Sequence, residues 1–198
     1  MAVFWWLWFR GGNARNEEDR RLLLFGLLSS CLGLMIARIL AWSLPFRERP
    51  LHSPWLHFQI PFGVDPNSLI GWSSFPSDHA TLYFALAITF FYVSRTIGIA
   101  ALVYTAIVVC LPRIYLGIHY PTDIVAGALL GIGVGSLGRF QKLRSPVTGP
   151  LWQWLEKSQA SFYAFLFVWS FSLAEQFDDL RALGGAALKL AKLTYYTV

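Results

Sequence analysis

Five long apolar runs dominate this chain and restrict its fold. They cover about residues 21–44, 77–94, 96–117, 121–138 and 159–176. Most approach the roughly 20 apolar residues that an α-helix needs to cross the hydrocarbon core of a bilayer. The sequence therefore predicts an all-α protein, a polytopic transmembrane helical bundle with about five spans plus interfacial helices.

The composition also favours a membrane protein. Only 14% of the 198 residues are charged, whereas about 25% is usual in a soluble domain. The net charge of +5 arises from short basic clusters between the apolar runs, which is the pattern of membrane topology signals. We therefore expect the lipid bilayer as a partner and no nucleic acid. We also expect one integral membrane domain over 1–198, with its core at about 21–140 and an extra span and amphipathic tail at 141–198.

The two ends of the chain and its two cysteines are best explained as structural features. Cys31 and Cys110 lie within apolar runs, so we interpret them as packing residues and expect no disulfide. The stretch 1–12 is apolar but too short to span and has no basic flank before it, so we predict an interfacial segment rather than a signal peptide. The stretch 178–192 predicts an amphipathic helix on the outer surface, with a solvated tail as the alternative.

The connections between the runs indicate topology. The segment 46–75, rich in proline and tryptophan, should lie along the membrane surface with short helical turns, because irregular backbone is not tolerated in hydrocarbon. With five spans, one face receives nine basic residues: Arg10, Arg15, Arg20, Arg21, Arg95, Arg139, Lys142, Arg144 and Lys157. The positive-inside rule makes that face cytoplasmic and turns the other outward, to the periplasm in a bacterium.

Two local patterns predict how the spans pack. Only Arg95 and Thr96 join the second run to the third, so these two helices should form a tight antiparallel pair. Gly127, Gly131 and Gly135 recur at four-residue spacing along the fourth run. Such a stripe lets a neighbouring helix approach closely, and we assign it a packing role only.

Three groups of polar residues fall on the same predicted face of the membrane. They are Arg47, Arg49 and Pro50 after the first run, Pro76, Ser77, Asp78 and His79 before the second, and Arg113, His119 and Asp123 between the third and fourth. Ionisable groups at membrane depth are costly and usually mark function. Singly, each has a simpler explanation as an interfacial, capping or snorkelling residue, but their convergence at one level favours a site.

Each group offers a different chemistry. Arginine presents a charged planar fork of donors that suits phosphate oxygens. Ser77 follows a proline and predicts a helix start, whose free N–H groups near Asp78 attract anions. His119 and Asp123 are four residues apart, with Pro121 at the first turn of a helix. That spacing would let the carboxylate bond one imidazole nitrogen and leave the other free to attack.

The order Arg-Pro, Pro-Ser-x-His and Arg-x5-His-x3-Asp resembles the type-2 phosphatidic acid phosphatase superfamily. The resemblance covers residues 47–123, with each element in the expected order and membrane context. "SSFPSDHAT" and "FRERP" resemble especially the bacterial branch that hydrolyses undecaprenyl diphosphate. The resemblance implies a lipid phosphatase of the bacterial inner membrane, with its site facing the periplasm or outer side, a membrane lipid phosphate as substrate and no metal or cofactor.

The family mechanism assigns roles to the matching residues. His119 would attack phosphorus and form a phosphohistidine, while Asp123 would orient its ring and stabilise its charge. His79 would protonate the leaving oxygen and later activate water. The phosphate oxygens would be held by Arg49, Arg113, Ser77 and the N–H of Asp78.

This sequence departs from the family pattern at three positions. Trp42 stands where the family has a lysine, and Arg38, Arg47 or no residue at all would replace that charge. Asp78 stands where the family has a glycine, so a carboxylate would repel phosphate unless it turns away or pairs with an arginine. Pro112 replaces a common serine, which is a smaller loss.

Other functions fit parts of the pattern. Phosphatidate or phosphatidylglycerophosphate are alternative substrates, and a non-enzymatic lipid-phosphate binder or transport protein is an alternative of another class. His79, His119 and Asp123 would also suit a metal ion, although neighbouring arginines would oppose a cation. Trp55 and Trp72 are interpreted as membrane-interface anchors.

Overall fold

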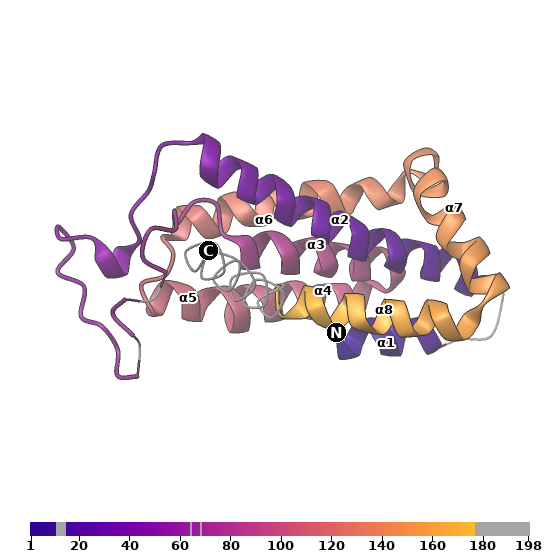
Figure 1. The fold of residues 1–198 in the computed structure, drawn as a ribbon. Helices are drawn as coiled ribbons and strands as arrows, with labels where there is room; N and C mark the ends of the chain where they lie inside the picture. Colours follow the sequence, from indigo (N-terminus) through magenta and orange to yellow (C-terminus); the bar gives the residue numbers. More distant parts are fainter. Residues whose placement is uncertain (11–14, 64, 68, 177–198) are drawn as a thin grey trace, which may run out of the picture. The chain divides into compact units, whose positions relative to one another are not determined.

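The computed structural model describes residues 1–10, 15–63, 65–67 and 69–176 (Figure 1). Every regular element in these ranges is helical, which confirms the all-α prediction. The chain forms two compact units, one within 10–149 and the other combining 1–9 with residues from 150 onward. The single membrane phosphatase domain over 1–198 stays a prediction. The amphipathic helix expected at 178–192 lies outside the described residues.

The larger unit holds most of the helices. In chain order they are α2 (Arg15–Ser43), the 3₁₀ turn η1 (Pro50–His52), α3 (Asp78–Val93), α4 (Arg95–Tyr104), the π-helical η2 (Thr105–Cys110), α5 (Leu111–Tyr115), α6 (Pro121–Ser136), the 3₁₀ turn η3 (Leu137–Arg139) and the start of α7 (Gln141–Lys157). Three stretches here are long and apolar enough to cross a membrane: Glu17–Ser43, Arg95–Tyr115 and Pro121–Arg139. The shorter α3 and α8 (Gln159–Ala174) are also apolar, so all five predicted runs are helices.

The smaller unit contains α1 (Ala2–Phe9), the end of α7 and α8. Two of its N-terminal tryptophans bond to α8: Trp5 Nε1 donates to Ser170 Oγ at 3.2 Å, and Trp8 Nε1 to Tyr163 OH at 3.3 Å. Trp8 is buried. The N-terminal apolar stretch is therefore a helix whose aromatic side chains pack on a later helix of the same unit.

Glycines bring α3 and α6 into backbone contact. A Cβ atom added at Gly127 would lie 2.5 Å from the Ser77 carbonyl oxygen, and one at Gly131 would lie 2.3 Å from that of Thr81. A Cβ atom added at Gly135 would lie 2.6 Å from the carbonyl oxygen of Ala85 in α3. The packing role predicted for this stripe is confirmed, because each glycine lies where any larger side chain would push the helices apart.

The tight turn between the second and third apolar helices is also as expected. Only Ser94 separates α3 from α4, and a Cβ added at Gly98 would lie 2.0 Å from the Cα of Phe91. Cys31 and Cys110 are free thiols.

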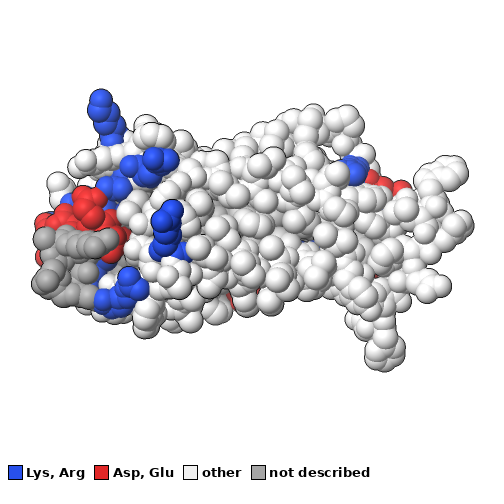
Figure 2. Space-filling view, turned by 180° about the vertical axis from the view of Figure 1, so that it is seen from behind, with Lys and Arg blue, Asp and Glu red and all other residues white. Residues whose placement is uncertain are grey.

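Charged side chains are unevenly placed. Figure 2 shows Lys and Arg side chains in groups, with stretches of uncharged surface beside them. In the larger unit, Arg15, Arg20 and Arg21 lie at the start of α2 and Arg139 follows the end of α6, which agrees with the clustering seen in the sequence. Arg144 is buried there, pairing with Glu18 and donating to the Gly138 carbonyl at 2.9 Å.

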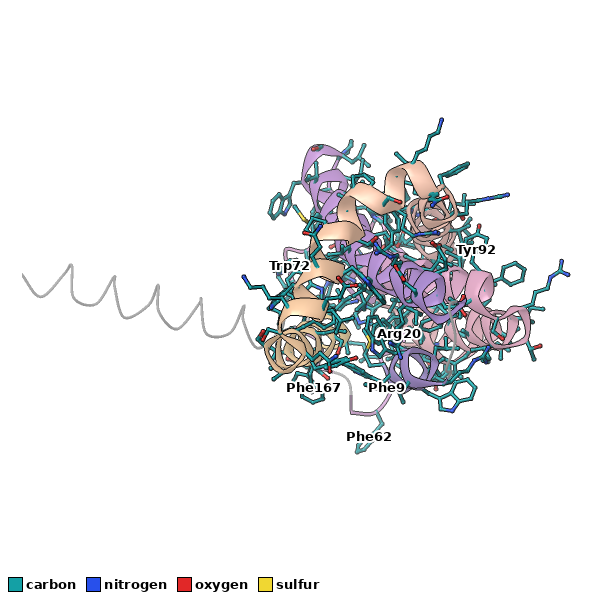
Figure 3. All side chains as sticks on the ribbon, turned by 90° about the vertical axis from the view of Figure 1, so that its right-hand side faces the viewer. Phe9, Arg20, Phe62, Trp72, Tyr92 and Phe167 are labelled. Carbon is teal, nitrogen blue, oxygen red and sulfur yellow. The ribbon has the colours of Figure 1, made fainter. Side chains whose placement is uncertain are left out.

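The long connection between α2 and α3 lies at the opposite end of these helices and contains η1 (Figure 1). Trp55 is 88% exposed, and Phe62 projects away from the helices (Figure 3). Exposed aromatic side chains of this kind suit a segment at a membrane interface. The short helical turn expected in this segment is present.

Candidate active site

The predicted site residues come from one end of the larger unit. The long α2–α3 connection, the first turn of α3 and the α5–α6 connection meet there (Figure 1). The N–H of Ser77 donates to the carbonyl of Asp123 at 3.1 Å, which joins the start of α3 to the start of α6. Arg38, near the end of α2, forms an ion pair with Asp78 at 2.5 Å. Residues distant in the sequence are thus assembled by helix ends.

His119 is buried, and its ring is oriented by a backbone group. Nδ1 lies 2.8 Å from the carbonyl oxygen of Ser74. A carbonyl can only accept a hydrogen bond, so Nδ1 carries a proton, and in the neutral ring Nε2 holds the lone pair. Asp123 Oδ2 is 3.7 Å from Nδ1, which is beyond hydrogen-bond length. The carboxylate bond expected from the four-residue spacing is therefore replaced by a bond to Ser74.

Asp123 is completely buried at the start of α6. Its Oδ2 accepts the N–H of Tyr120 at 2.8 Å, and its Oδ1 accepts from Nη1 of Arg47 at 2.7 Å. Pro121 begins the helix as predicted, and negative charge in a first turn is favoured by the helix dipole. The carboxylate is thus fixed by two donors, close enough to His119 to stabilise a positive charge on its ring.

Arg49 ties together two connections through its guanidinium. It donates to three backbone carbonyls: Nε to Trp72 at 3.2 Å, Nη1 to Ile118 at 2.8 Å and Nη2 to Ser73 at 3.2 Å. A guanidinium has five N–H donors, so one N–H on each terminal nitrogen remains for a ligand. Burial lowers the pKa of Arg49 to about 10, opposed by the nearby charge of Asp78. Arg49 therefore stays charged at neutral pH.

The start of α3 carries the departure from the family glycine. Ser77 is the N-cap, and its Oγ accepts the N–H of Ala80 at 3.4 Å, so its own hydroxyl hydrogen can still be donated. Asp78 is paired with Arg38, whose guanidinium also lies 4.8 Å from the ring centre of Trp72. The carboxylate therefore meets an arginine, one of the two arrangements that reduce its repulsion of phosphate. Trp72, predicted as a membrane anchor, contacts a site arginine.

The structure places His79 and Arg113 at the same end of the unit. His79 is half-buried in the first turn of α3, with its ring centre 6.4 Å from that of Tyr83. Arg113 is half-buried in α5, and its charge acts on Arg49. Within the described ranges, no three His, Cys, Asp or Glu side chains are placed to share a metal ion.

Two residues, Ser74 and Tyr120, contribute to the site through backbone groups, so their side chains give no indication of that role. Ser74 acts through its carbonyl oxygen, and the sequence carries no signal for that role. Tyr120 supplies the N–H that holds Asp123. The sequence does signal this contact, because a proline followed two residues later by aspartate is typical of the first turn of a helix, where the carboxylate bonds back to the N-cap.

Comparisons with known proteins place the chain beside a family of phosphatases. The PAP2 superfamily matches residues 45–142. Undecaprenyl-diphosphatase BcrC of Bacillus subtilis is 30% identical over 132 residues, 66% of this chain and 64% of that protein. Bacitracin transport permease protein BcrC of Bacillus licheniformis is 32% identical over 131 residues, 66% and 57% of the two chains. Decaprenylphosphoryl-5-phosphoribose phosphatase of Mycobacterium tuberculosis is 36% identical over 130 residues, 64% of each.

The matched region covers less than two thirds of each of these relatives. No solved structure showed a significant match.

Proposed function

Because the chain belongs to the PAP2 superfamily, we propose that it is a membrane phosphatase that removes phosphate from a lipid mono- or diphosphate. The observation that carries this proposal is the setting of His119. Its Nδ1 is bound by the Ser74 carbonyl at 2.8 Å. The buried carboxylate of Asp123 and the buried guanidinium of Arg49 both bond to the α5–α6 connection that carries His119. That arrangement prepares Nε2 as a nucleophile.

The reaction proceeds in two displacements. Nε2 of His119 attacks phosphorus, and the bond to the leaving oxygen breaks as His79 gives that oxygen a proton. Water then attacks the phosphohistidine, passing a proton to His79, and the P–N bond breaks. Asp123, 3.7 Å from Nδ1, stabilises the positive charge that the ring carries between the two steps.

Cationic and N–H groups hold the phosphate oxygens during both displacements. The groups assigned to this task are the two remaining N–H donors of Arg49, Arg113, the hydroxyl of Ser77 and the N–H of Asp78. Arg38 supplies positive charge in place of the family lysine, although Asp78 already neutralises part of it. Donors placed where charge develops account for much of the rate in phosphoryl transfer.

The two arginines are expected to differ in their effect on rate. Arg113→Ala should lower kcat/KM by roughly 10²–10³-fold, since it removes a direct donor to the transferring phosphoryl group. Arg38→Ala should cost less, about tenfold, because Arg38 acts on the phosphate indirectly, by neutralising Asp78, whose carboxylate is left unpaired in the variant. Steady-state hydrolysis by the purified variants measures the difference, and equal losses would contradict this division of the cationic groups.

Undecaprenyl diphosphate, converted to the monophosphate, is the leading substrate. It is named for the Bacillus subtilis relative, and a site facing the periplasm of a bacterial inner membrane would suit the recycling of such a carrier. Phosphatidate, phosphatidylglycerophosphate and the phosphoribose lipid named for the mycobacterial relative are alternatives. Purified protein should be assayed on all four in excess EDTA. Fastest release from undecaprenyl diphosphate is expected, and loss of activity in EDTA would contradict a metal-independent mechanism.

A transport function is the second candidate. It is supported by the name of the Bacillus licheniformis relative, a bacitracin transport permease. Phosphate release by the purified protein in detergent separates the two, because a transporter without hydrolytic activity would bind lipid phosphate and release none.

A further inference from the structure

We propose that Arg47 is a positioning residue that acts on His119 through Asp123 and Ser74, and that it does not bind the substrate phosphate. This inference rests on the proposed function and deepens it. Arg47 lies two residues before the Arg49–Pro50 pair that resembles the family motif. Its charge makes it look like one more phosphate ligand, but its contacts point to another task.

The side chain of Arg47 is directed at the first turn of α6. Nη1 donates to Asp123 Oδ1 at 2.7 Å and to Thr122 Oγ1 at 3.0 Å. Each terminal guanidinium nitrogen carries two hydrogens, so both hydrogens of Nη1 are used. The guanidinium carbon also lies 4.4 Å from the ring centre of Tyr120. Three neighbouring residues of one helix start therefore hold this arginine.

The backbone of Arg47 makes the second connection. Its N–H donates to Ser73 Oγ at 3.3 Å, and its carbonyl accepts the N–H of Ser74 at 2.9 Å. The carbonyl of that same Ser74 accepts Nδ1 of His119 at 2.8 Å. Arg47 is thus bonded to both residues that face the proposed nucleophile: through its backbone to the N–H of Ser74, whose carbonyl orients the ring, and through its side chain to the carboxylate of Asp123.

Burial makes this contact important for Asp123. The carboxylate is 0% exposed, and a buried charge is strongly disfavoured without a partner. If Arg47 were removed, Asp123 would take up a proton or turn toward another donor. In either case the ring of His119 would lose support at the moment when the P–N bond makes it positive.

Arg49 shows the contrasting arrangement. Its three bonded N–H groups meet only neutral carbonyls, so its positive charge is available to a phosphate, whereas the charge of Arg47 is paired with the carboxylate of Asp123. A residue that binds phosphate contributes to substrate affinity and to binding of phosphate analogues. A residue that positions Asp123 contributes to the chemical step, so the two roles are separable by kinetics.

The test is a double-mutant cycle with Arg47→Gln, Asp123→Asn and both together, assayed on undecaprenyl diphosphate. Arg47→Gln should lower kcat about 10²-fold with KM and the vanadate inhibition constant nearly unchanged. In the Asp123→Asn background, which needs no counter-charge, the same change should cost less than about threefold. Arg47→Lys, which keeps the charge, should recover part of kcat. Arg139→Gln is the matched control, since this exposed arginine also lies over an aromatic ring, 5.7 Å from Phe140.

Two kinetic results would overturn the inference. One is an Arg47→Gln variant whose KM and vanadate inhibition constant rise tenfold while kcat is retained. The other is an equal loss from Arg47→Gln in both backgrounds. Thermal unfolding of the wild type, the two single variants and the double variant in detergent gives a readout without catalysis. A double variant whose unfolding temperature differs from the sum of the two single shifts supports the Arg47–Asp123 contact, and additive shifts contradict it. If the wild type hydrolyses no lipid phosphate but the unfolding temperatures are non-additive, the proposed function is wrong and the Arg47–Asp123 contact is still supported.

Discussion

Replacing His119 with alanine is expected to reduce kcat for phosphate release by roughly 10⁴-fold or more, as removal of a nucleophile does in other covalent hydrolases. The reason lies in the ring's surroundings. Nδ1 is committed to the Ser74 carbonyl at 2.8 Å, so Nε2 is the nitrogen available to phosphorus. No other histidine in the described residues shares both a bound Nδ1 and a buried carboxylate four residues later.

The measurement combines steady-state hydrolysis with trapping of radiolabelled enzyme from a ³²P-labelled lipid. Wild type should carry label on histidine, and His119→Ala should carry none. His57→Asn is a suitable control, because His57 is exposed on the long connection with φ +43, a conformation that asparagine tolerates. A His119→Ala protein that is folded and within tenfold of wild-type kcat would remove the nucleophile from this mechanism.

The helices were predictable because lipid imposes a simple demand on the sequence. A run such as 121–138 must satisfy its backbone internally, and it becomes α6. The glycine stripe likewise predicted a close helix neighbour, since small residues are what permit close approach. The sequence did not reveal the division into two units, because an apolar surface can pack on another helix or on lipid.

The site was predictable where charged side chains stand out against apolar surroundings. Arg49, His119 and Asp123 were recognised for that reason, and the structure joins them through the long connection. Their orientation was not predictable. The spacing of His119 and Asp123 suggested a direct bond, but a nearby backbone carbonyl, that of Ser74, is the closer acceptor. The direction of Arg47 depends on how the connection folds back, which no local pattern encodes.

Gly131→Ala is expected to destabilise the protein by about 2–3 kcal/mol, because overpacking a tight contact forces the backbone to move. The added Cβ would lie 2.3 Å from the Thr81 carbonyl oxygen, an atom fixed in α3 that cannot rotate away. Gly133→Ala is the matched control on the same helix, since nothing lies within 4 Å of its added Cβ. It should be neutral or stabilising by up to about 1 kcal/mol from helix propensity. Unfolding in detergent measures both.

The same substitution should also reach the active site. If α3 moves away from α6, the first bond to stretch is the one from the Ser77 N–H to the Asp123 carbonyl, which is 3.1 Å long. This bond belongs to the same contact between the two helices and lies one helical turn beyond Gly127. The start of α3 would then withdraw its phosphate donors from His119. Phosphate release should therefore fall in Gly131→Ala even below its unfolding temperature, and stay unchanged in Gly133→Ala. Equal stability and activity in the two variants would show that the α3–α6 contact does not hold the two halves of the site together.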